Sequence, residues 1–361
     1  MRSVLKIIMA VLLTLAAVLA LIIINAHLTF YDPAESELLH NEEVTPTLTD
    51  TSTISVMTWN LGYAGLDKEM DFFYDGGTQV RTTRDQTIIN LNAILDQIKH
   101  HKNLDFFLLQ EADKAARRSY FINMPDSIKS TLPEAHLSFA KNYHVRFVPV
   151  PWYAPMGRVT SGIVTAGHHS PEAVYRLSFP GNYPWPGRLF NLKRGLLLSR
   201  YPLTNGKELI LINTHNSAFD DGSLRRHQMD FLKKIMHAEY AKGNYVIAGG
   251  DFNQCPPGFE PEFFFNIFDD ENVLLIPDDF MPDWHFVYDP TVPTNRSVIK
   301  PYSPATTKTT LIDFFIASPN VMPLGVQGIH LDFEHSDHNP VIATFKLLGP
   351  HSMPPDRYIS R

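Results

Sequence analysis

Polar side chains suited to metal binding and acid–base chemistry stand where several apolar, β-rich runs of the sequence end. They are Asn60 after 54–59, Glu111 after 106–110, His215 after 209–214, Asp251 and Asn253 after 245–250, Asp313 within 311–317, and Asp337 and His338 before 341–345. Carboxylate and amide oxygens suit Mg²⁺ or Mn²⁺. Histidines beside acids suit proton transfer and charge stabilisation on a phosphate ester. One such residue alone is typical of a turn, so the prediction rests on the repetition.

These side chains can act together only if the strands that carry them end at one edge of a sheet. Short β-rich runs alternate along the chain with helical patterns. Thr83, with Gln86 three residues later, and Ser223 are each predicted to cap a helix. Residues 195–200 and 208–213 predict a hairpin. We therefore expect an α/β fold in which helices cover mixed sheets.

Composition limits the class of protein. The chain has 361 residues, of which 44% are hydrophobic and 19% are charged. These values exclude a disordered chain, a disulfide-rich miniprotein and a collagen-like repeat. The single cysteine, Cys255, excludes an intrachain disulfide and a cysteine-based zinc site, and we expect its thiol to be buried. Nothing after residue 53 reads as an interdomain linker, so one catalytic domain is expected over 54–348, followed by a tail over 349–361.

The N-terminal region predicts a membrane anchor. Residues 7–24 form an apolar run, which spans about 27 Å as a helix and so matches the hydrocarbon core of a bilayer. Residues 1–6 are then a cytoplasmic end, and 25–53, rich in acids, Thr, Pro and Ser, a flexible tether. Because Arg2 and Lys6 precede the run, the catalytic domain is expected outside the cytoplasm, in a periplasmic or extracellular space. The alternative is a signal peptide whose cleavage secretes the domain.

Six short motifs occur in a fixed order along the chain. They are TWN (58–60), LQE (109–111), NTH (213–215), GDFN (250–253), IDFF (312–315) and SDHNPV (336–341). Together they resemble the endonuclease/exonuclease/phosphatase superfamily, which includes pancreatic-type deoxyribonucleases, abasic-site endonucleases, sphingomyelinases and inositol polyphosphate 5-phosphatases. The resemblance covers roughly residues 54–346. It implies a four-layer α/β sandwich of two mixed β-sheets with helices outside, here preceded by one transmembrane helix.

The resemblance also implies a role for each motif residue in metal-dependent phosphoester hydrolysis. Asn60, Glu111 and Asp337 would hold Mg²⁺ or Mn²⁺, with Glu111 the principal ligand. His215 would contact the scissile phosphate, Asp251 would orient or deprotonate the attacking water, and Asn253 would hold the phosphate or the water. His338, oriented by Asp313, would stabilise the developing charge. A carboxylate beside His338 favours its cationic form, which suits that role.

Departures from the family's patterns and uneven charge bear on the substrate. Abasic-site endonucleases read Asn-x-Asp-Gly at the first motif, whereas Asn60 here is followed by Leu61 and Gly62, which argues against abasic-site repair. Residues 158–234 carry eleven basic and five acidic side chains and suit a phosphate-rich substrate. Trp and Tyr in the Pro-rich loops 151–156 and 179–186, and the Phe cluster at 263–265, suit a membrane interface.

We therefore favour an exported, membrane-tethered phosphodiesterase that acts on lipid head groups or small phosphoesters. The alternatives are an extracytoplasmic nuclease for DNA or RNA and, in a different class, a non-catalytic interaction module on the same fold. The net charge of −7 disfavours nucleic acid only mildly, because −4 of it belongs to residues 1–53. The expected partners are the phosphoester and, through 7–24, the membrane; no protein partner is implied.

Overall fold

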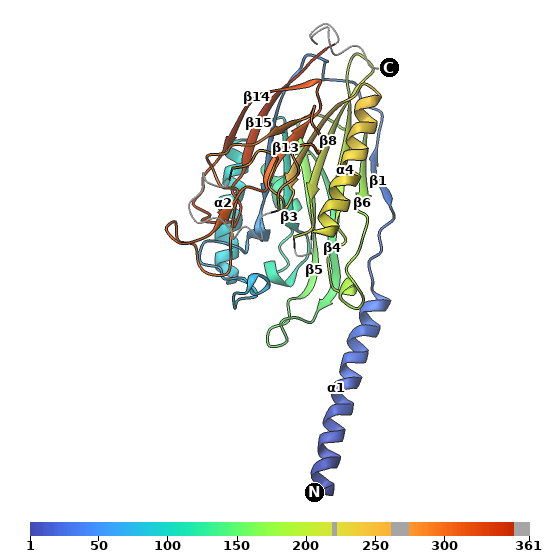
Figure 1. Ribbon diagram of the computed structural model, residues 1–361, viewed down its shortest axis with the longest axis vertical. Coiled ribbons are helices and arrows are strands. Elements are labelled where there is room, and N and C mark those ends of the chain that lie inside the picture. The colour runs from blue at the N-terminus through green and yellow to red at the C-terminus, as the bar shows by residue number, and fades with distance from the viewer. Residues whose placement is uncertain (219–221, 261–273, 350–361) are drawn as a thin grey trace.

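The computed structural model describes residues 1–218, 222–260 and 274–349, and two mixed β-sheets form its centre (Figure 1). One sheet has six strands in the spatial order β14 (Val321–Gly328), β15 (Val341–Leu347), β2 (Thr53–Asn60), β3 (Phe106–Asp113), β5 (Gly157–Gly167) and β4 (His136–Val148). The other has seven, in the order β1 (Ser36–Asn41), β6 (Ala173–Ser178), β7 (Gly195–Pro202), β8 (Glu208–His215), β9 (Tyr245–Asp251), β13 (Asp313–Ala317) and β10 (His285–Val287). β2 pairs with β3 and β8 with β9 in parallel, and the other neighbours run antiparallel.

Helices cover the outer faces of both sheets. α2 (Arg84–His100) and α3 (Met124–Thr131) pack on the six-stranded sheet, where Ile94 and Ile128 share one apolar cluster with Trp59. α4 (Ser223–Ala241) packs on the seven-stranded sheet, where Leu232 shares a second cluster with Ile210. A short ribbon of β11 (Asn295–Arg296) and β12 (Thr309–Thr310) and 3₁₀ turns at Gly62–Ala64, Phe73–Asp75, Arg117–Ser119 and Gly187–Leu189 complete the elements.

Side chains that alternate along the strands produce this layering. In β8, Leu209 and Leu211 enter the cluster between the two sheets, whereas Ile210 and Ile212 face α4. Successive side chains of a strand point to opposite faces, so a strand that is apolar at every position is buried on both sides. The predicted α/β sandwich of two mixed sheets flanked by helices is confirmed, and so is the hairpin of β7 and β8.

The two predicted helix caps have different outcomes. The Thr83 hydroxyl accepts a hydrogen bond from the backbone N–H of Gln86 and caps α2 as expected. The prediction that Ser223 caps α4 is wrong, because Ser223 is already the first helical residue and Gly222 precedes it with φ +90°. A glycine adopts this left-handed conformation without steric cost, so the chain turns into the helix one residue earlier. Cys255 is buried as expected.

A buried polar contact joins the two sheets beneath the edge where the motif residues gather. Gln110 of β3 donates a hydrogen bond from Nε2 to Oδ1 of Asn213 in β8 at 2.8 Å. Asn213 in turn donates from Nδ2 to the carbonyl of Val164 in β5 at 2.8 Å. Both amide side chains are fully buried. Because buried polar groups need their partners, this contact fixes the position of one sheet relative to the other.

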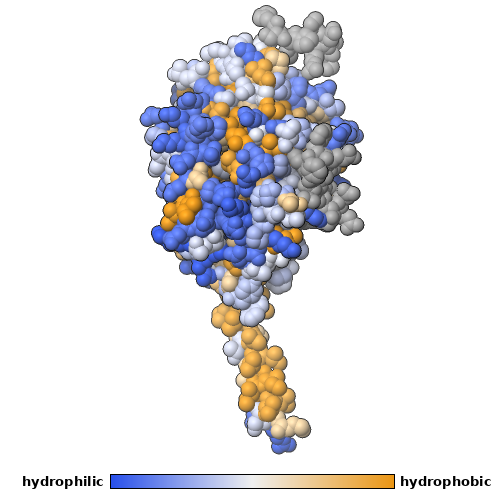
Figure 2. Space-filling view, turned by 90° about the vertical axis from the view of Figure 1, so that its left-hand side faces the viewer, coloured by the Kyte–Doolittle hydropathy of each residue, from blue (hydrophilic) through white to orange (hydrophobic). Residues whose placement is uncertain are grey.

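The N-terminal segment is one long helix followed by an edge strand. α1 (Arg2–Leu28) is long and apolar enough to cross a bilayer, with a mean hydropathy of 3.2 in its most apolar window and no residue of that window buried. A signal sequence near the N-terminus has the same features. Figure 2 shows this apolar helix projecting from a largely hydrophilic head.

The prediction of a flexible tether over 25–53 is wrong for its middle part. β1 pairs antiparallel with β6 and extends the seven-stranded sheet, and the Glu42 N–H donates to the carbonyl of Glu172. The strand is mostly exposed and lacks apolar alternation, because backbone pairing at a sheet edge needs no buried side-chain face. The tail at 350–361 and the Phe cluster at 263–265 lie outside the described residues.

We predict that Asn213→Ala destabilises the domain by about 1–3 kcal/mol for each buried group left unpaired. The substitution removes the donor to Val164 and one acceptor of Gln110 Nε2, which keeps its contacts with the Leu108 carbonyl and the Thr58 hydroxyl. Urea denaturation followed by circular dichroism measures the effect, with the exposed Asn103→Ala as a control. A variant within about 0.5 kcal/mol of the wild type would show that the contact does not hold the sheets together.

Candidate active site

The pairing register brings three of the predicted site residues into one row. His215, the last residue of β8, lies opposite Asp251 at the end of the parallel strand β9. Asp251 lies opposite Asp313, the first residue of the antiparallel strand β13. In the other sheet, Asn60 ends β2 and Glu111 lies near the end of β3. The sheets are packed face to face, so all five side chains meet at one edge of the sandwich.

Asp251 is the centre of this edge. Its Oδ2 accepts a hydrogen bond from Asn60 Nδ2 at 3.0 Å and lies 3.3 Å from His215 Nε2 and 3.8 Å from His338 Nε2. Its Oδ1 accepts from the backbone N–H of Asn253 at 2.9 Å. Burial raises the pKa of the Asp251 carboxyl, and the charge of Asp313 raises it further. Asp251 is therefore a stronger base than an exposed aspartate.

The two histidines at the edge differ in their protonation. His338 Nδ1 lies 2.7 Å from Asp313 Oδ2. Burial lowers the pKa of His338, but the charges of Asp313, Asp337 and Asp251 and the hydrogen bond with Asp313 together outweigh burial and raise it to about 10, so the ring is cationic at neutral pH. Burial and the nearby Arg194 hold the pKa of His215 well below its usual value, so that ring is neutral.

Two predicted site residues have left-handed backbone conformations. Glu111 has φ +53° where the pairing of β3 with β5 shifts register, and this bulge presents its carboxylate at the edge, with Oε1 3.9 Å from His215 Nε2. Asn253 has φ +52°, and its amide donates to the carbonyl of Asn216 at 2.9 Å. Left-handed conformations of non-glycine residues are strained. They occur often at functional sites, where the surrounding structure holds them in place.

Asp337 is a buried acid with an unsatisfied oxygen. Among the described residues, its Oδ1 has no hydrogen-bond partner. Burial raises its pKa to about 6, the charge of His338 lowers it and that of Glu111 raises it. A Cβ at Gly62, which has φ +49°, would lie 2.7 Å from this Oδ1, so only glycine leaves room beside the carboxylate.

The donor set fits a hard divalent cation. Glu111 and Asp337 offer carboxylate oxygens, and Asn60 offers an amide oxygen that already accepts from the Gly62 N–H at 3.0 Å. Acids buried close together favour a nearby positive charge, which a dication supplies. One ligand atom each of Asp251, Asp313 and His338 also lies within 4.8 Å of the others. His338 Nδ1, however, already contacts Asp313, so these three are better suited to orienting an imidazole than to binding a metal.

Several residues of this edge were not found from the sequence. The Asn295 amide lies 2.9 Å from His338 Nε2, across an isolated bridge between the two residues. Asp75 lies close enough for its charge to interact with Asp337 and Glu111, and burial, followed by these charges, raises its pKa to about 7. Asn295 lies in the two-residue strand β11 and Asp75 in a 3₁₀ turn, and both elements are too short for a periodicity that marks the inward-facing positions.

Comparison with known proteins agrees with this geometry. Residues 57–338 match the Endonuclease/Exonuclease/phosphatase family. Among curated protein sequences, none matches the chain significantly. Enzymes of this family are phosphoesterase or nuclease hydrolases that generally use divalent metals.

Solved structures share the fold at low identity. An endonuclease/exonuclease/phosphatase from Beutenbergia cavernae DSM 12333 has a TM-score of 0.58 and 18% identity, over 82% of this chain and 72% of that chain. One from Bacteroides vulgatus has a TM-score of 0.51 and 15% identity, over 82% and 99%. ANGEL2, described as a 2',3'-cyclic phosphatase, in complex with adenosine-2',3'-vanadate, has a TM-score of 0.53 and 16% identity, over 88% and 99%.

We predict that, in metal-free protein, the pKa of His338 lies above the usual histidine value and the pKa of His215 lies below it. With EDTA present, ¹⁵N NMR of labelled histidine should show His338 protonated at pH 8 and His215 neutral at pH 6. In Asp313→Asn, the pKa of His338 should fall, because the carboxylate that opposes the effect of burial is gone. A pKa of about 6.5 for His338 in the wild type, the value of an unperturbed histidine, would contradict this description.

Proposed function

Because the chain belongs to the endonuclease/exonuclease/phosphatase family, we propose that it hydrolyses a phosphoester with a bound divalent metal ion. The observation that carries the proposal is the position of Asp251, which lies between a neutral and a cationic imidazole and within 3.0 Å of Asn60. This arrangement combines a buried base with two groups suited to phosphate oxygens. Such a combination favours attack of water on an anionic ester.

Each side chain has a role in the proposed reaction. Water attacks phosphorus and Asp251 takes its proton. The ester P–O bond breaks, and the departing alkoxide takes up a proton from solvent and leaves as the alcohol. His215 donates to a phosphate oxygen, and the His338 cation, held by Asp313 at 2.7 Å, stabilises the negative charge that develops. The Asn253 backbone N–H orients Asp251. Asn60, Glu111 and Asp337 would hold Mg²⁺ or Mn²⁺, which supplies further positive charge at the phosphate.

The place where α1 joins the domain supports a substrate at a membrane surface. Asp32 and Pro33, a few residues beyond α1, line the same groove as Ser217, which lies two residues past His215. Trp185 donates from Nε1 to His27 in α1 at 3.2 Å. If α1 crosses a bilayer, the catalytic edge is therefore close to the point where the chain leaves the membrane.

Exposed aromatic side chains lie on the same side of the domain. Trp152 is 87% exposed and Tyr153 57% exposed, in the loop between β4 and β5. This green loop projects in the same direction as α1 in Figure 1. Trp185, beside α1, is 56% exposed. Because Trp and Tyr favour the membrane–water interface, we propose lipid head groups or small phosphoesters as substrates and a domain on the extracytoplasmic side.

A nuclease is the second candidate. Basic side chains gather at the groove beside the catalytic edge, where Lys193 and Arg194 line the wall. Arg188 is close enough for its charge to lower the pKa of Lys193, although burial lowers it more. Basic grooves suit the backbone of a nucleic acid. Cleavage of the signal segment would then release a soluble enzyme.

We predict that Asp251→Asn lowers turnover about 10²–10⁴-fold on any phosphoester that the wild type cleaves, because it removes the base. The near-isosteric change should leave the thermal melt close to that of the wild type. Wild-type activity should also vanish with EDTA and return with Mg²⁺ or Mn²⁺. The exposed Asp230→Asn is the matched control. Full turnover in Asp251→Asn would contradict the assignment.

We predict that the aromatic tips matter only for substrate in a bilayer. Trp152→Ala with Tyr153→Ala should lower hydrolysis of sphingomyelin or phosphatidylinositol-phosphate vesicles several-fold and leave a soluble ester unaffected. The control is Leu324→Ala on β14, which is 53% exposed. Cleavage of supercoiled plasmid without activity on either vesicle would favour the nuclease.

A further inference from the structure

The groove next to the catalytic edge contains the guanidinium group of Arg194, which lacks one of its hydrogen-bond partners among the described residues. The groove is open to solvent and is lined by residues of segments 178–183 and 192–194 and by residues near the start of α4. Nη1 of Arg194 is buried, and among the described residues it has no hydrogen-bond partner. A buried charged donor without an acceptor is unfavourable unless a ligand completes its bonding.

The neighbouring cations are already engaged. Lys193 donates to Asn182 Oδ1, and its ammonium lies 4.5 Å from the centre of the Phe30 ring. Arg118 makes hydrogen bonds with both oxygens of Asp113, at 2.9 and 3.1 Å. Arg225 donates to the carbonyl of Asn253 at 3.1 Å. Unlike these three, Arg194 has a guanidinium nitrogen that its surroundings leave unused.

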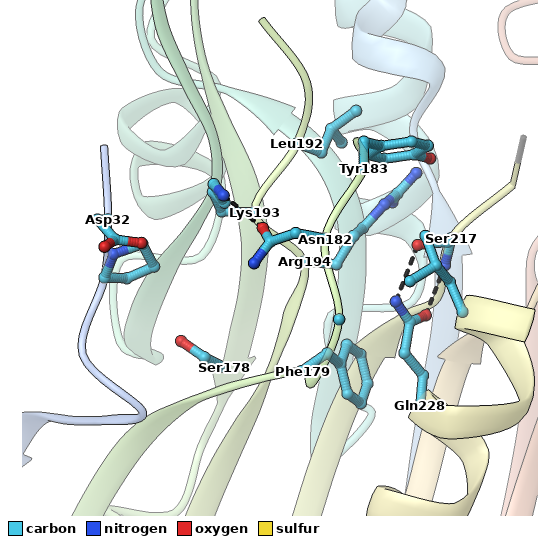
Figure 3. Close-up of a pocket in the computed structure, with 13 residues that line it drawn as sticks. Asp32, Ser178, Phe179, Asn182, Tyr183, Leu192, Lys193, Arg194, Ser217 and Gln228 are labelled. Atoms are coloured by element: carbon cyan, nitrogen blue, oxygen red, sulfur yellow. Dashed lines mark hydrogen bonds between the residues drawn. The ribbon is translucent and has the colours of Figure 1, made fainter. Parts of the chain in front are cut away.

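The electrostatics locate Arg194 beside the reaction centre. Burial lowers its pKa, and the charges of Glu111 and Asp251 raise it. Reciprocally, the charge of Arg194 lowers the pKa of His215. Figure 3 shows the Arg194 guanidinium beside the Tyr183 ring, whereas Lys193 points to Asn182. A group bound at Arg194 would therefore lie next to the phosphate that His215 contacts.

We propose that Arg194 binds a phosphate group of the substrate through its free Nη1. This inference rests on the proposed hydrolytic function. The planar guanidinium matches two phosphate oxygens at once. The hydroxyl of Ser217 lies on the same wall, held by the side chain of Gln228 at 2.8 Å. The phosphate is either the scissile group or a second phosphate on the same head group.

Direct binding tests the proposal without catalysis. Isothermal titration with inorganic phosphate, in EDTA, should show that Arg194→Met weakens binding about tenfold or more, because a hydrogen-bonded charge pair is lost. Arg194→Lys should recover only part of the affinity, since it keeps the charge and loses the fork. The exposed Arg226→Met is the control and should bind as the wild type does. Equal affinity in Arg194→Met would overturn the proposal.

Hydrolysis then distinguishes the two phosphates. If Arg194 binds the scissile group, Arg194→Met lowers the rates of hydrolysis of phosphatidylinositol and phosphatidylinositol-phosphate equally. If it binds a second phosphate, only the rate for phosphatidylinositol-phosphate falls. Each result supports the proposal, and unchanged rates on both oppose it. Absence of wild-type hydrolysis would count against the proposed function, while the titration would still decide for or against binding at Arg194. A lower melting temperature with unchanged phosphate affinity would assign Arg194 a structural role instead.

Discussion

The site depends on the alignment of two separate sheets at one edge, and the buried contact between Gln110 and Asn213 is the interaction that sets it. Gln110 directly precedes Glu111, and Asn213 lies two residues before His215. A shift of one sheet relative to the other would therefore break the contact and would also move Glu111 away from His215. Buried amide donors are costly without acceptors, so the geometry that pairs Gln110 Nε2 with Asn213 Oδ1 and Asn213 Nδ2 with the Val164 carbonyl is preferred. The polar residues of two motifs thus join the sheets, and their neighbours Glu111 and His215 are the residues proposed to act on the substrate.

Unequal environments explain how similar side chains acquire different roles at this edge. Asp313 keeps His338 cationic, whereas His215, near Arg194, is neutral. The edge also holds several carboxylates, and burial, with a further contribution from the charge of Glu111, raises the pKa of Asp337 among them. A divalent cation and an anionic ester, bound together, would complete this charge distribution. Metal binding and phosphate binding would therefore depend on each other, because the cation offsets the negative charge of both the carboxylates and the phosphate.

The sequence was informative where local pattern and burial agree. The buried strands and the Thr83 cap follow from side-chain periodicity and capping chemistry. β1 escaped notice because its pairing is a backbone interaction with a strand over 130 residues away. Asn295, in the two-residue strand β11, reaches the site through the tertiary fold alone. The basic stretch 158–234 was noticed, but the sequence could not show which of its cations is buried in the groove, as Arg194 is. The eight predicted site residues lie along the candidate edge, but their detailed contacts could not be foreseen: the Asn253 amide, for example, is bonded to the Asn216 carbonyl.

The central claim is that this edge is a metal-dependent hydrolytic centre, and the position of a bound metal tests it most directly. Crystals of residues 29–361, which keep β1 and lack α1, can be soaked in Mn²⁺ and measured at the manganese absorption edge. The account predicts an anomalous peak at the carboxylates of Glu111 and Asp337 in the wild type, and its loss in Glu111→Gln. Saturating Mn²⁺ that gives no peak at these carboxylates, in protein that hydrolyses a phosphoester, would contradict it.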